Sequence, residues 1–580
     1  MIASMLAVLA ILAIGLFVTV RFWTGESPSL ATTIVVGLAI GLSVLPVIGY
    51  VVILTTGFSA AAIYAALALT LAVMVVVQIR IPQGRMNWVP PVVNKELIYS
   101  LVLPLAISSL SLLMRLYAVL LAEPLSEVDP WYWLYNTRIL LATGRIDYSL
   151  AGAYPFGFVL LAALIASDTP SYEATYAVIR FIGPVISGVT TFAVFKATQK
   201  CFGGNWRVAS IASIGFAVGN LLQFRGRIGT PETEALFLFV VFLSYLYIYE
   251  QRSMPLTALL FAGLIAVHPT TALVAFLIWV LSEFRIPQRV TLAADIRRAA
   301  RYCVVITLLL LPVLAALIIN TDVIARYAFY AAGLPLDQGE TPLAIVRNSL
   351  DSLVIYSLGV VLFGVSLVGV LRNVVGFRRE KWAYIGWGLC VLWALSAFIP
   401  VIFFRFGAPR AATFIVFPAM IIVGHVYTNI IDSIQSPSTH GSLLRSARFK
   451  EAAIVLLIVS AQVFYGCTYG YLGERYIPEA GLNSLEWIAG SGIDADSVFV
   501  YDSWVARNIA QAVLYPLPSF ANDTLRYGPY SNLTEYIDDY FREVLVIVGV
   551  EEALYGNLTA SGHVEVYNNA GVSVVLYNRP

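Results

Sequence analysis

The most informative feature of this chain is a pair of acidic stretches, Ser126-Glu127-Val128-Asp129-Pro130-Trp131-Tyr132 and Thr230-Pro231-Glu232-Thr233-Glu234-Ala235. Each lies at the edge of a long apolar run, so we expect both stretches to lie near one face of a membrane. Ionised side chains at such a depth are costly and are commonly functional. The pattern therefore predicts that carboxylates from distant helix ends converge at one membrane face.

The composition predicts a polytopic α-helical membrane protein. Apolar residues make up 59% of the chain and charged residues 12%, and the mean hydropathy is +0.82. Apolar runs of membrane-spanning length predict about fourteen transmembrane helices. They lie at 3–20, 31–53, 59–79, 98–122, 174–197, 207–222, 234–250, 255–284 (long enough for two), 301–320, 350–371, 382–403, 411–430 and 451–470. The net charge of +1 argues against nucleic acid as a partner.

The basic residues of the loops set the expected orientation. Arginine and lysine gather in alternate loops, for example at Arg285 to Arg301 and at Arg372 to Lys381, and such loops are cytoplasmic by the positive-inside rule. The acidic stretches then fall on the opposite, extracytoplasmic face of the cell membrane. The predicted outer loops are 123–173, 223–233 and 321–349. Interfacial helices are expected in the first of these loops, with Trp131 to Trp133 at the level of the lipid headgroups.

The last part of the chain changes in composition. Residues 471–580 are more polar, with expected strands at Val498 to Tyr501 and Val544 to Val548 and a hairpin around Asn568-Asn569-Ala570-Gly571. We expect a soluble, extracytoplasmic α/β domain here.

The acidic side chains suit a divalent cation. Carboxylate oxygens are the ligands that Mg²⁺ and Mn²⁺ prefer, and such a cation can neutralise a phosphate leaving group. An enzyme that acts on a lipid phosphate is therefore predicted. Two simpler interpretations stay open: Asp129 as a solvated acid in an interfacial belt, and Glu232 with Glu234 as acids that favour the first turn of a helix begun by Pro231.

Other polar residues predicted on the outer face are further candidates. Arg225 precedes the second acidic stretch, and Arg405 and Arg410 flank a Gly-Ala-Pro break, so all three could bind phosphate oxygens by paired hydrogen bonds, with snorkelling at the membrane edge as the alternative for Arg225. Glu340 lies in an acidic turn that could close over bound substrate or be a plain solvated turn. His268, before Pro269, is interpreted as a core histidine with satisfied hydrogen bonds.

A family resemblance is carried by these same motifs. The strings Arg115-Leu-Tyr-Ala-Val, Glu127-Val-Asp129-Pro-Trp-Tyr, Asn136-Thr-Arg138 and Tyr154-Pro155 resemble the first outer loop of the catalytic subunit of oligosaccharyltransferase. Arg225 followed by Glu232-Thr-Glu234-Ala is similar to the second acidic motif of that family, and Gly339-Glu340-Thr-Pro is similar to its mobile-loop motif. The order of elements agrees from about residue 98 to residue 520.

The resemblance implies a divergent glycosyltransferase of the GT-C architecture. Asp129, Glu232 and Glu234 would hold Mn²⁺ or Mg²⁺; Asp129 and Glu340 would engage the acceptor amide; Arg225 and either Arg405 or Arg410 would bind the donor phosphate. The glycan would pass, with inversion, from a polyprenyl or dolichyl (pyro)phosphate to an acceptor polypeptide. The GT-C catalytic region would cover residues 98–470, after an extra three-helix segment at 1–97 that is either an accessory bundle or a docking surface.

One departure from the family concerns acceptor recognition. The WWDYG motif of the family should fall near Val500 to Arg507, where only Asp502 and Trp504 remain, in a different order. Two alternatives to transfer onto asparagine therefore stay open. One is a GT-C transferase with a lipid-monophosphate sugar donor and a lipid or hydroxyl acceptor. The other is a non-catalytic transporter or assembly subunit. The sequence does not indicate whether the protein needs accessory membrane subunits as partners.

Overall fold

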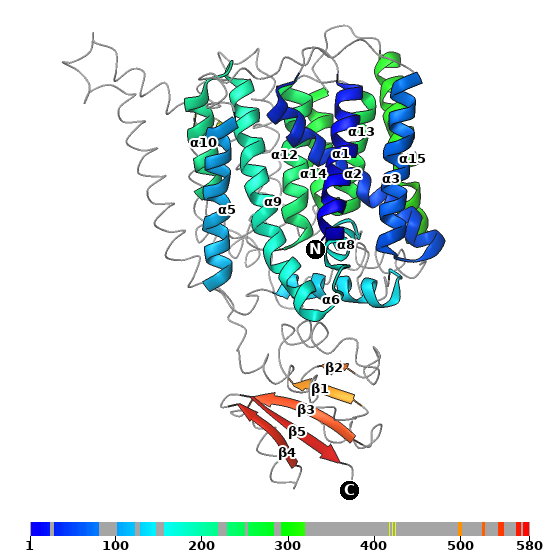
Figure 1. Ribbon diagram of the computed structural model, residues 1–580, viewed down its shortest axis with the longest axis vertical. Helices are drawn as coiled ribbons and strands as arrows, with labels where there is room; N and C mark the ends of the chain where they lie inside the picture. Colours follow the sequence, from blue (N-terminus) through cyan, green and yellow to red (C-terminus); the bar gives the residue numbers. More distant parts are fainter. Residues whose placement is uncertain are drawn as a thin grey trace, which may run out of the picture.

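The structure is a computed structural model of the chain. It describes residues 2–23, 28–80, 101–121, 128–146, 156–218, 229–249, 253–283 and 292–319, the helical positions 417, 420, 421 and 424, and strands within 497–501, 525–527, 543–549, 564–569 and 572–578. A bundle of helices lies above a small sheet that holds the C-terminal strands (Figure 1). The spans predicted between 350 and 470 lie outside the described residues, apart from the four helical positions.

The helices up to residue 319 follow the apolar runs of the sequence. They are α1 (Ile2–Phe22), α2 (Leu30–Thr56), α3 (Ala60–Arg80), α5 (Leu103–Leu121), α6 (Val128–Thr143), α8 (Gly157–Ala166), α9 (Tyr172–Cys201), α10 (Trp206–Val218), α12 (Pro231–Leu243), α13 (Met254–Val267), α14 (Pro269–Glu283) and α15 (Leu292–Ile319). The run at 255–284 does form two helices, and a π-helical turn, η2 (Ser244–Ile248), continues α12. Within the described residues, three helices are long and apolar enough to cross a membrane, namely Leu30–Thr56, Tyr172–Cys201 and Pro231–Ile248.

Glycines let α1 and α2 approach closely. A Cβ atom on Gly15 would overlap the carbonyl oxygen of Gly37, and one on Gly41 would overlap the carbonyl oxygen of Ile11. Helices in lipid associate through close packing rather than through the hydrophobic effect, because lipid tails are as apolar as leucine. Small residues at this crossing therefore determine how α1 packs on α2.

The helix α2 lies in the interior of the bundle. It contacts α1, α3, α8, α9, α12, α13 and α15. Gly263 of α13 packs directly on Ser43, and Gly49 has Leu160 of α8 within 2.9 Å of where a Cβ would lie. The hydroxyl of Tyr50 accepts a hydrogen bond of 2.7 Å from the backbone N–H of Phe156, the residue before α8. The N-terminal segment is thus part of the protein core.

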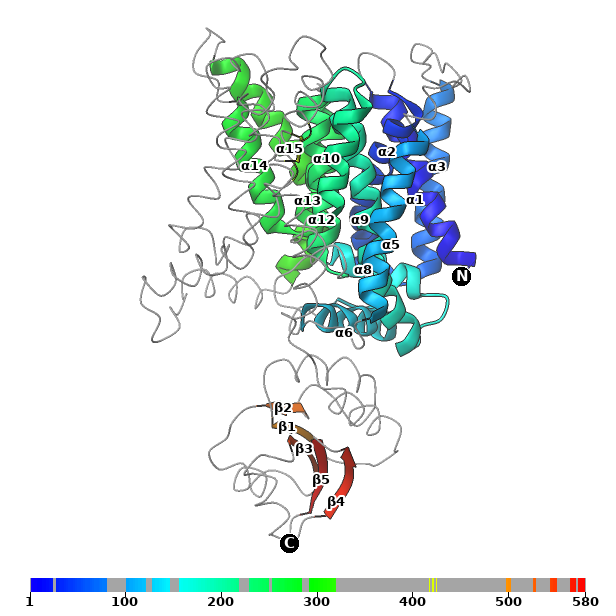
Figure 2. The same cartoon turned by 90° about the vertical axis from the view of Figure 1, so that its left-hand side faces the viewer.

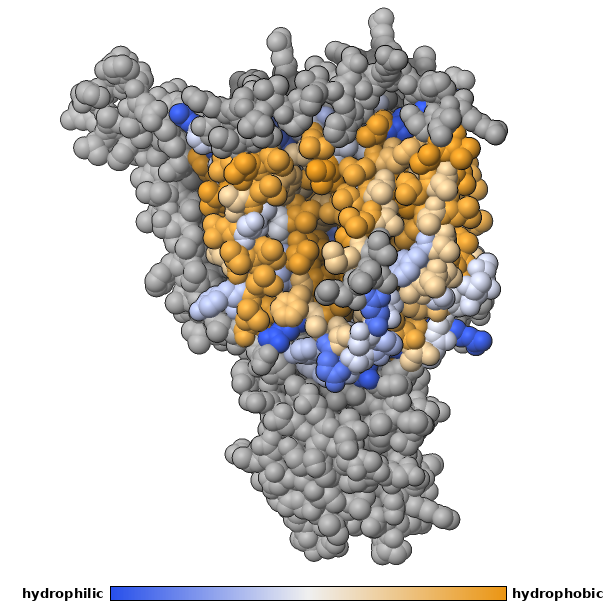
Figure 3. Space-filling model, in the orientation of Figure 1, coloured by the Kyte–Doolittle hydropathy of each residue, from blue (hydrophilic) through white to orange (hydrophobic). Residues whose placement is uncertain are grey.

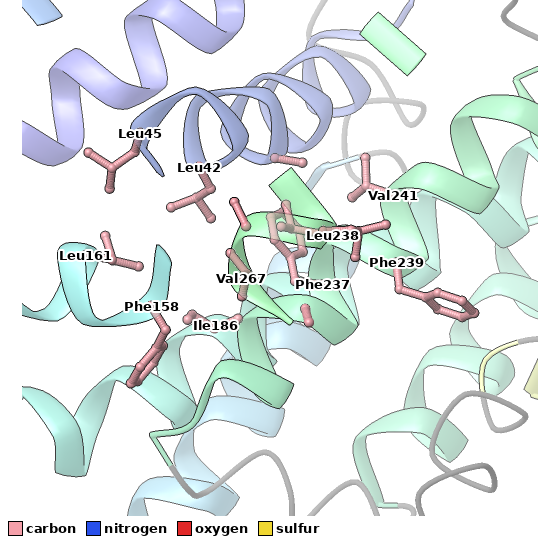
Figure 4. Close-up of a cluster of buried hydrophobic side chains, with 14 of the residues drawn as sticks. Leu42, Leu45, Phe158, Leu161, Ile186, Phe237, Leu238, Phe239, Val241 and Val267 are labelled. Atoms are coloured by element: carbon pink, nitrogen blue, oxygen red, sulfur yellow. The ribbon is translucent and has the colours of Figure 1, made fainter. Parts of the chain in front are cut away.

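The core is centred where α2, α8, α9, α12 and α13 meet. Side chains from all five helices gather there (Figure 4), and they include Leu42, Leu45, Phe158, Leu161, Ile186, Phe237, Leu238 and Val267. Large apolar side chains also cover the outside of the bundle, as Leu69, Leu113 and Leu308 do. Figure 3 shows this apolar band on one face of the described surface, as expected for a surface in contact with lipid.

The predicted outer loop 123–173 contains two helices with unexpected burial. The helix α8 is buried along nearly its whole length. In α6, Trp131 is 0% exposed and packs against Tyr176 of α9, with ring centroids 5.7 Å apart. Trp133 is also buried, against Phe158. Trp131 and Trp133 thus fill the space between α6, α8 and α9, and their level at the lipid headgroups stays a prediction.

The described C-terminal strands form a mixed sheet of order β2-β1-β3-β5-β4. The strands are β1 (Ser497–Tyr501), β2 (Leu525–Tyr527), β3 (Glu543–Gly549), β4 (Val564–Asn569) and β5 (Val572–Asn578). β1 is parallel to both β2 and β3, whereas β5 is antiparallel to β3 and β4. The strands predicted at 498–501 and 544–548 and the hairpin around 568–571 are confirmed.

Candidate functional site

The first turns of α9 organise one end of the bundle. Tyr176 packs against Trp131 of α6, and the guanidinium of Arg138, also from α6, lies 5.2 Å from the ring centre of Tyr172. Arg180 donates a hydrogen bond of 2.9 Å to the carbonyl oxygen of Val119 at the end of α5. Both views place α6 across the end of the bundle that faces the strands (Figures 1 and 2). We call this end of the bundle the α6 end.

The start of α12 is packed against the same part of α9. A Cβ on Gly229 would overlap the carbonyl oxygen of Ile179, so only glycine allows this approach. Thr230 is the N-cap with an extended backbone, and Pro231 then begins the helix, which suits its fixed φ and missing N–H. The acidic first turn of α12 is thereby held at the α6 end.

The two glutamates of this turn differ in environment. The side chain of Glu232 is 17% exposed. Glu234 is 1% exposed, and its Oε2 atom has no hydrogen-bond partner among the described residues. A buried carboxylate oxygen without a partner is costly, and helix capping does not account for it. The environment of Glu234 therefore fits a site for a positively charged group.

His268 faces the acidic turn from the junction of α13 and α14. Its Nε2 atom lies 3.7 Å from Oε1 of Glu232, and its side chain is 4% exposed. The core-histidine interpretation is correct for Nδ1, which lies 2.8 Å from the hydroxyl of Thr271. It missed the contact with Glu232, which joins distant parts of the chain. The only available signal was a histidine before a helix-starting proline on the same predicted face.

A second residue missed from the sequence is Arg180. It is buried, and its guanidinium lies 5.9 Å from the ring centre of Tyr176. It follows Ile179, whose carbonyl oxygen packs against Gly229. A buried cation therefore lies in the turn of α9 that supports the acidic start of α12.

The structure describes only some of the predicted site residues. Glu232 and Glu234 are fully described. Asp129 lies in the first turn of α6, at the same end of the bundle, but its side chain is not among those described. The remaining predicted residues lie outside the described residues, namely Arg225, Glu340, Arg405, Arg410, Asp502 and Trp504.

The described residues alone do not make up a complete metal site. Among them, no group of three or more His, Cys, Asp or Glu side chains could hold a metal ion. The donor set still fits a hard divalent cation, because Glu234 offers a buried oxygen that no described residue hydrogen-bonds and Glu232 lies in the same turn. Asp129, on the helix that crosses this end, is the predicted third ligand.

Comparison with solved structures defines the class of fold. No protein-family model matches the chain, and no curated protein matches it significantly. The fold of the chain is similar to that of a solved oligosaccharyltransferase, so the predicted resemblance is confirmed at the level of the fold. The oligosaccharyltransferase of Archaeoglobus fulgidus, in its apo form, is similar with a TM-score of 0.50 and 13% identity, over 77% of this chain and 70% of that chain.

Other solved structures are similar at comparable levels. The A. fulgidus oligosaccharyltransferase in complex with Zn and sulfate has a TM-score of 0.49 and 14% identity, over 78% of this chain and 69% of that chain. ArnT from Cupriavidus metallidurans, bound to undecaprenyl phosphate, has a TM-score of 0.49 and 10% identity, over 84% of this chain and 98% of that chain.

Proposed function

We propose that this protein is a metal-dependent, multi-pass membrane glycosyltransferase. It transfers a glycan from a polyprenyl or dolichyl (pyro)phosphate to the asparagine of an acceptor polypeptide, on the extracytoplasmic face. The observation that carries the proposal is the buried carboxylate oxygen of Glu234, which has no hydrogen-bond partner among the described residues and lies at the α6 end of a fold similar to that of an oligosaccharyltransferase.

The cation would be held by Asp129, Glu232 and Glu234. When bound, Mn²⁺ or Mg²⁺ supplies positive charge that stabilises the departing phosphate. The closely packed start of α12 supports this role, because Gly229 and Pro231 fix the backbone that carries both glutamates. A rigid backbone keeps ligands in place between catalytic cycles.

The remaining proposed residues bind the two substrates. Arg225 and either Arg405 or Arg410 bind the phosphate oxygens of the donor by charge-assisted hydrogen bonds. Asp129 and Glu340 orient the acceptor amide, whose nitrogen bonds to the anomeric carbon as the bond from that carbon to the phosphate oxygen breaks. The amide proton passes to one of the two carboxylates that engage the amide, Asp129 or Glu340, and the configuration inverts because the attack is direct. This step requires positioning rather than a protein nucleophile.

A second candidate function is favoured by one sequence observation. The segment around Asp502 and Trp504 lacks the WWDYG order that the family uses to select an asparagine acceptor. The second candidate is a GT-C transferase that takes a sugar from a lipid monophosphate and passes it to a lipid or hydroxyl acceptor. The same acidic site at the α6 end would serve both reactions.

One experiment tests both candidates. Purified protein is incubated with Mn²⁺, with polyprenyl-pyrophosphate glycan or polyprenyl-monophosphate sugar, and with peptides that contain Asn-x-Thr or Gln-x-Thr. Mass spectrometry should find glycan only on the Asn-x-Thr peptide. Sugar on lipid or hydroxyl acceptors, with unmodified peptides, would favour the second candidate. Absence of any transfer from either donor would contradict the proposed activity.

Substitutions connect the activity to the site. Asp129→Ala and Glu232→Ala should each abolish transfer, because each removes a proposed ligand. Glu173→Ala is the matched control, since Glu173 is an exposed acid in the first turn of α9. That control should retain transfer close to the wild-type rate. Full transfer by the Asp129 or Glu232 variants would refute the site assignment.

A further inference from the structure

His268 is held rigidly by the junction that it forms between two helices. Its backbone N–H donates to the carbonyl oxygen of Leu264 and ends α13, and its own carbonyl oxygen accepts from the N–H of Ala272 in α14. Pro269 follows, and a residue before proline is restricted to extended backbone. His268 has φ −153° and ψ 96°, as this restriction requires.

This backbone makes the His268 ring the side-chain cap of α14. The N–H of Thr271 donates to Nδ1 of His268 at 3.2 Å, and the Thr271 hydroxyl lies 2.8 Å from the same atom. An Nδ1 that accepts a hydrogen bond leaves the ring proton of the neutral imidazole on Nε2. The N–H at Nε2 is then the group that faces Glu232.

The distance between the two side chains is informative. At 3.7 Å, the contact from Nε2 to Oε1 of Glu232 is longer than a direct N–H···O hydrogen bond. A carboxylate has about four lone-pair positions, so a contact of this length acts on Glu232 through the dipole of the Nε2–H bond and leaves the oxygen lone pairs to a ligand. Both partners are also fixed by helix starts, at Pro231 and at Pro269.

We propose that His268 is a positioning residue that orients the carboxylate of Glu232 for a divalent cation. The inference rests on the proposed metal site and adds a residue that does not itself bind the ion. A role in capping α14 alone is the competing explanation. The two roles use different ring nitrogens, so they can be separated by substitution.

Two variants each keep the hydrogen-bonding role of one ring nitrogen and remove the role of the other. In His268→Asn the side chain can still accept from the N–H of Thr271, because asparagine is a preferred N-cap residue, but it is too short to reach Glu232. In His268→Gln the longer side chain can place its amide N–H near the position of Nε2, and the cap is weakened. The measurements are Mn²⁺ affinity, by electron paramagnetic resonance titration of the full-length protein without donor or acceptor, and the melting temperature without metal.

We expect each variant to change one of the two measured quantities, the Mn²⁺ affinity or the melting temperature, and to leave the other near its wild-type value. His268→Asn should keep the wild-type melting temperature and lose about tenfold to a hundredfold in Mn²⁺ affinity, the usual effect of removing a partner of a metal ligand. His268→Gln should melt at a lower temperature and keep an affinity within about threefold of wild type, because the N–H toward Glu232 remains.

Two results would overturn the inference, and they differ in what else they affect. Wild-type Mn²⁺ affinity in His268→Asn, with Glu232→Gln binding weakly, would limit His268 to capping and leave the proposed function intact. Absence of Mn²⁺ binding by the wild-type protein itself would overturn both the inference and the proposed metal dependence.

Discussion

At the scale of single residues, the buried acid of α12 is the feature that calls most strongly for a ligand. An ionisable group inside an apolar helix is retained when it serves a function, because its burial is unfavourable. Glu234 has neither solvent nor a described hydrogen-bond partner at Oε2. The missing partner is consistent with a bound cation, since a cation would satisfy this oxygen and offset the cost of burying the charge.

Substitution of Glu234 tests this interpretation through stability. Glu234→Gln replaces a buried charge by a neutral amide of nearly the same volume, so the metal-free protein should become more stable by about 1–3 kcal/mol, because an unpaired buried charge costs more than a neutral polar group. The stabilisation that Mn²⁺ gives the wild-type protein should disappear, because only a ligand that binds the folded state raises its stability. Thermal unfolding in detergent, with and without Mn²⁺, measures both effects.

The control for this prediction is Glu173→Gln, which neutralises an exposed acid in the first turn of α9. It should leave the Mn²⁺ effect unchanged. A Glu234→Gln protein that is less stable than wild type without metal would contradict the interpretation, because it would mean that the carboxylate is satisfied within the protein.

At the scale of helices, the sequence predicts where each helix lies along the chain better than it predicts whether the helix faces protein or lipid. The helices α1, α2, α3, α5 and α9 lie where the apolar runs place them, because about 20 apolar residues specify a helix whatever it packs against. Burial is different: lipid and protein interior are both apolar, so composition does not distinguish them. The burial of α8 and of Trp131 in α6 therefore follows only from tertiary packing.

The crossing of α1 and α2 gives a prediction at this scale. Gly15→Ala places a methyl group on the backbone of Gly37, which must move because a backbone atom cannot rotate away. We expect the free energy of unfolding to fall by about 1–3 kcal/mol, as for overpacked interiors, seen as a lower melting temperature of the purified protein.

Gly188→Ala is the matched control in α9, since its Cβ would lie 3.3 Å from the Cβ of Leu112. Equal melting temperatures for the two variants would show that the α1 and α2 crossing is looser than described.

The residues of the candidate site also fall into two groups, those that the sequence predicts and those that only tertiary packing reveals. Asp129, Glu232 and Glu234 are recognisable in the sequence because charge is rare beside apolar runs. His268 and Arg180 gain their relation to the site from contacts with distant segments, through Glu232 in one case and through the turn that supports Gly229 in the other. Such contacts have no local sequence signal, so the structure was needed to find them.

At the scale of the whole molecule, the N-terminal segment has the largest consequence. The sequence left open whether residues 1–97 form an accessory bundle or a docking surface. In the structure α2 contacts α9 and α13, which pack against the acidic start of α12 or carry His268 at their end, and it also contacts α12 itself. Tyr50 also holds the backbone of Phe156 at the entry to α8. Structural support of the catalytic region is therefore the role that we propose for this segment.

Deletion of the segment tests that role. A chain of residues 98–580 loses α2 and exposes the surfaces of α12 and α13 that contact it, including Gly263, which packs on Ser43. We expect this chain to aggregate or to melt well below the full-length protein in size-exclusion and thermal unfolding experiments. Co-expression of residues 1–97 as a separate chain should restore a monodisperse complex, because packing rather than covalent continuity holds α2 in place. If residues 98–580 alone are monodisperse and melt at the wild-type temperature, the segment is an accessory and the central position of α2 has no structural role.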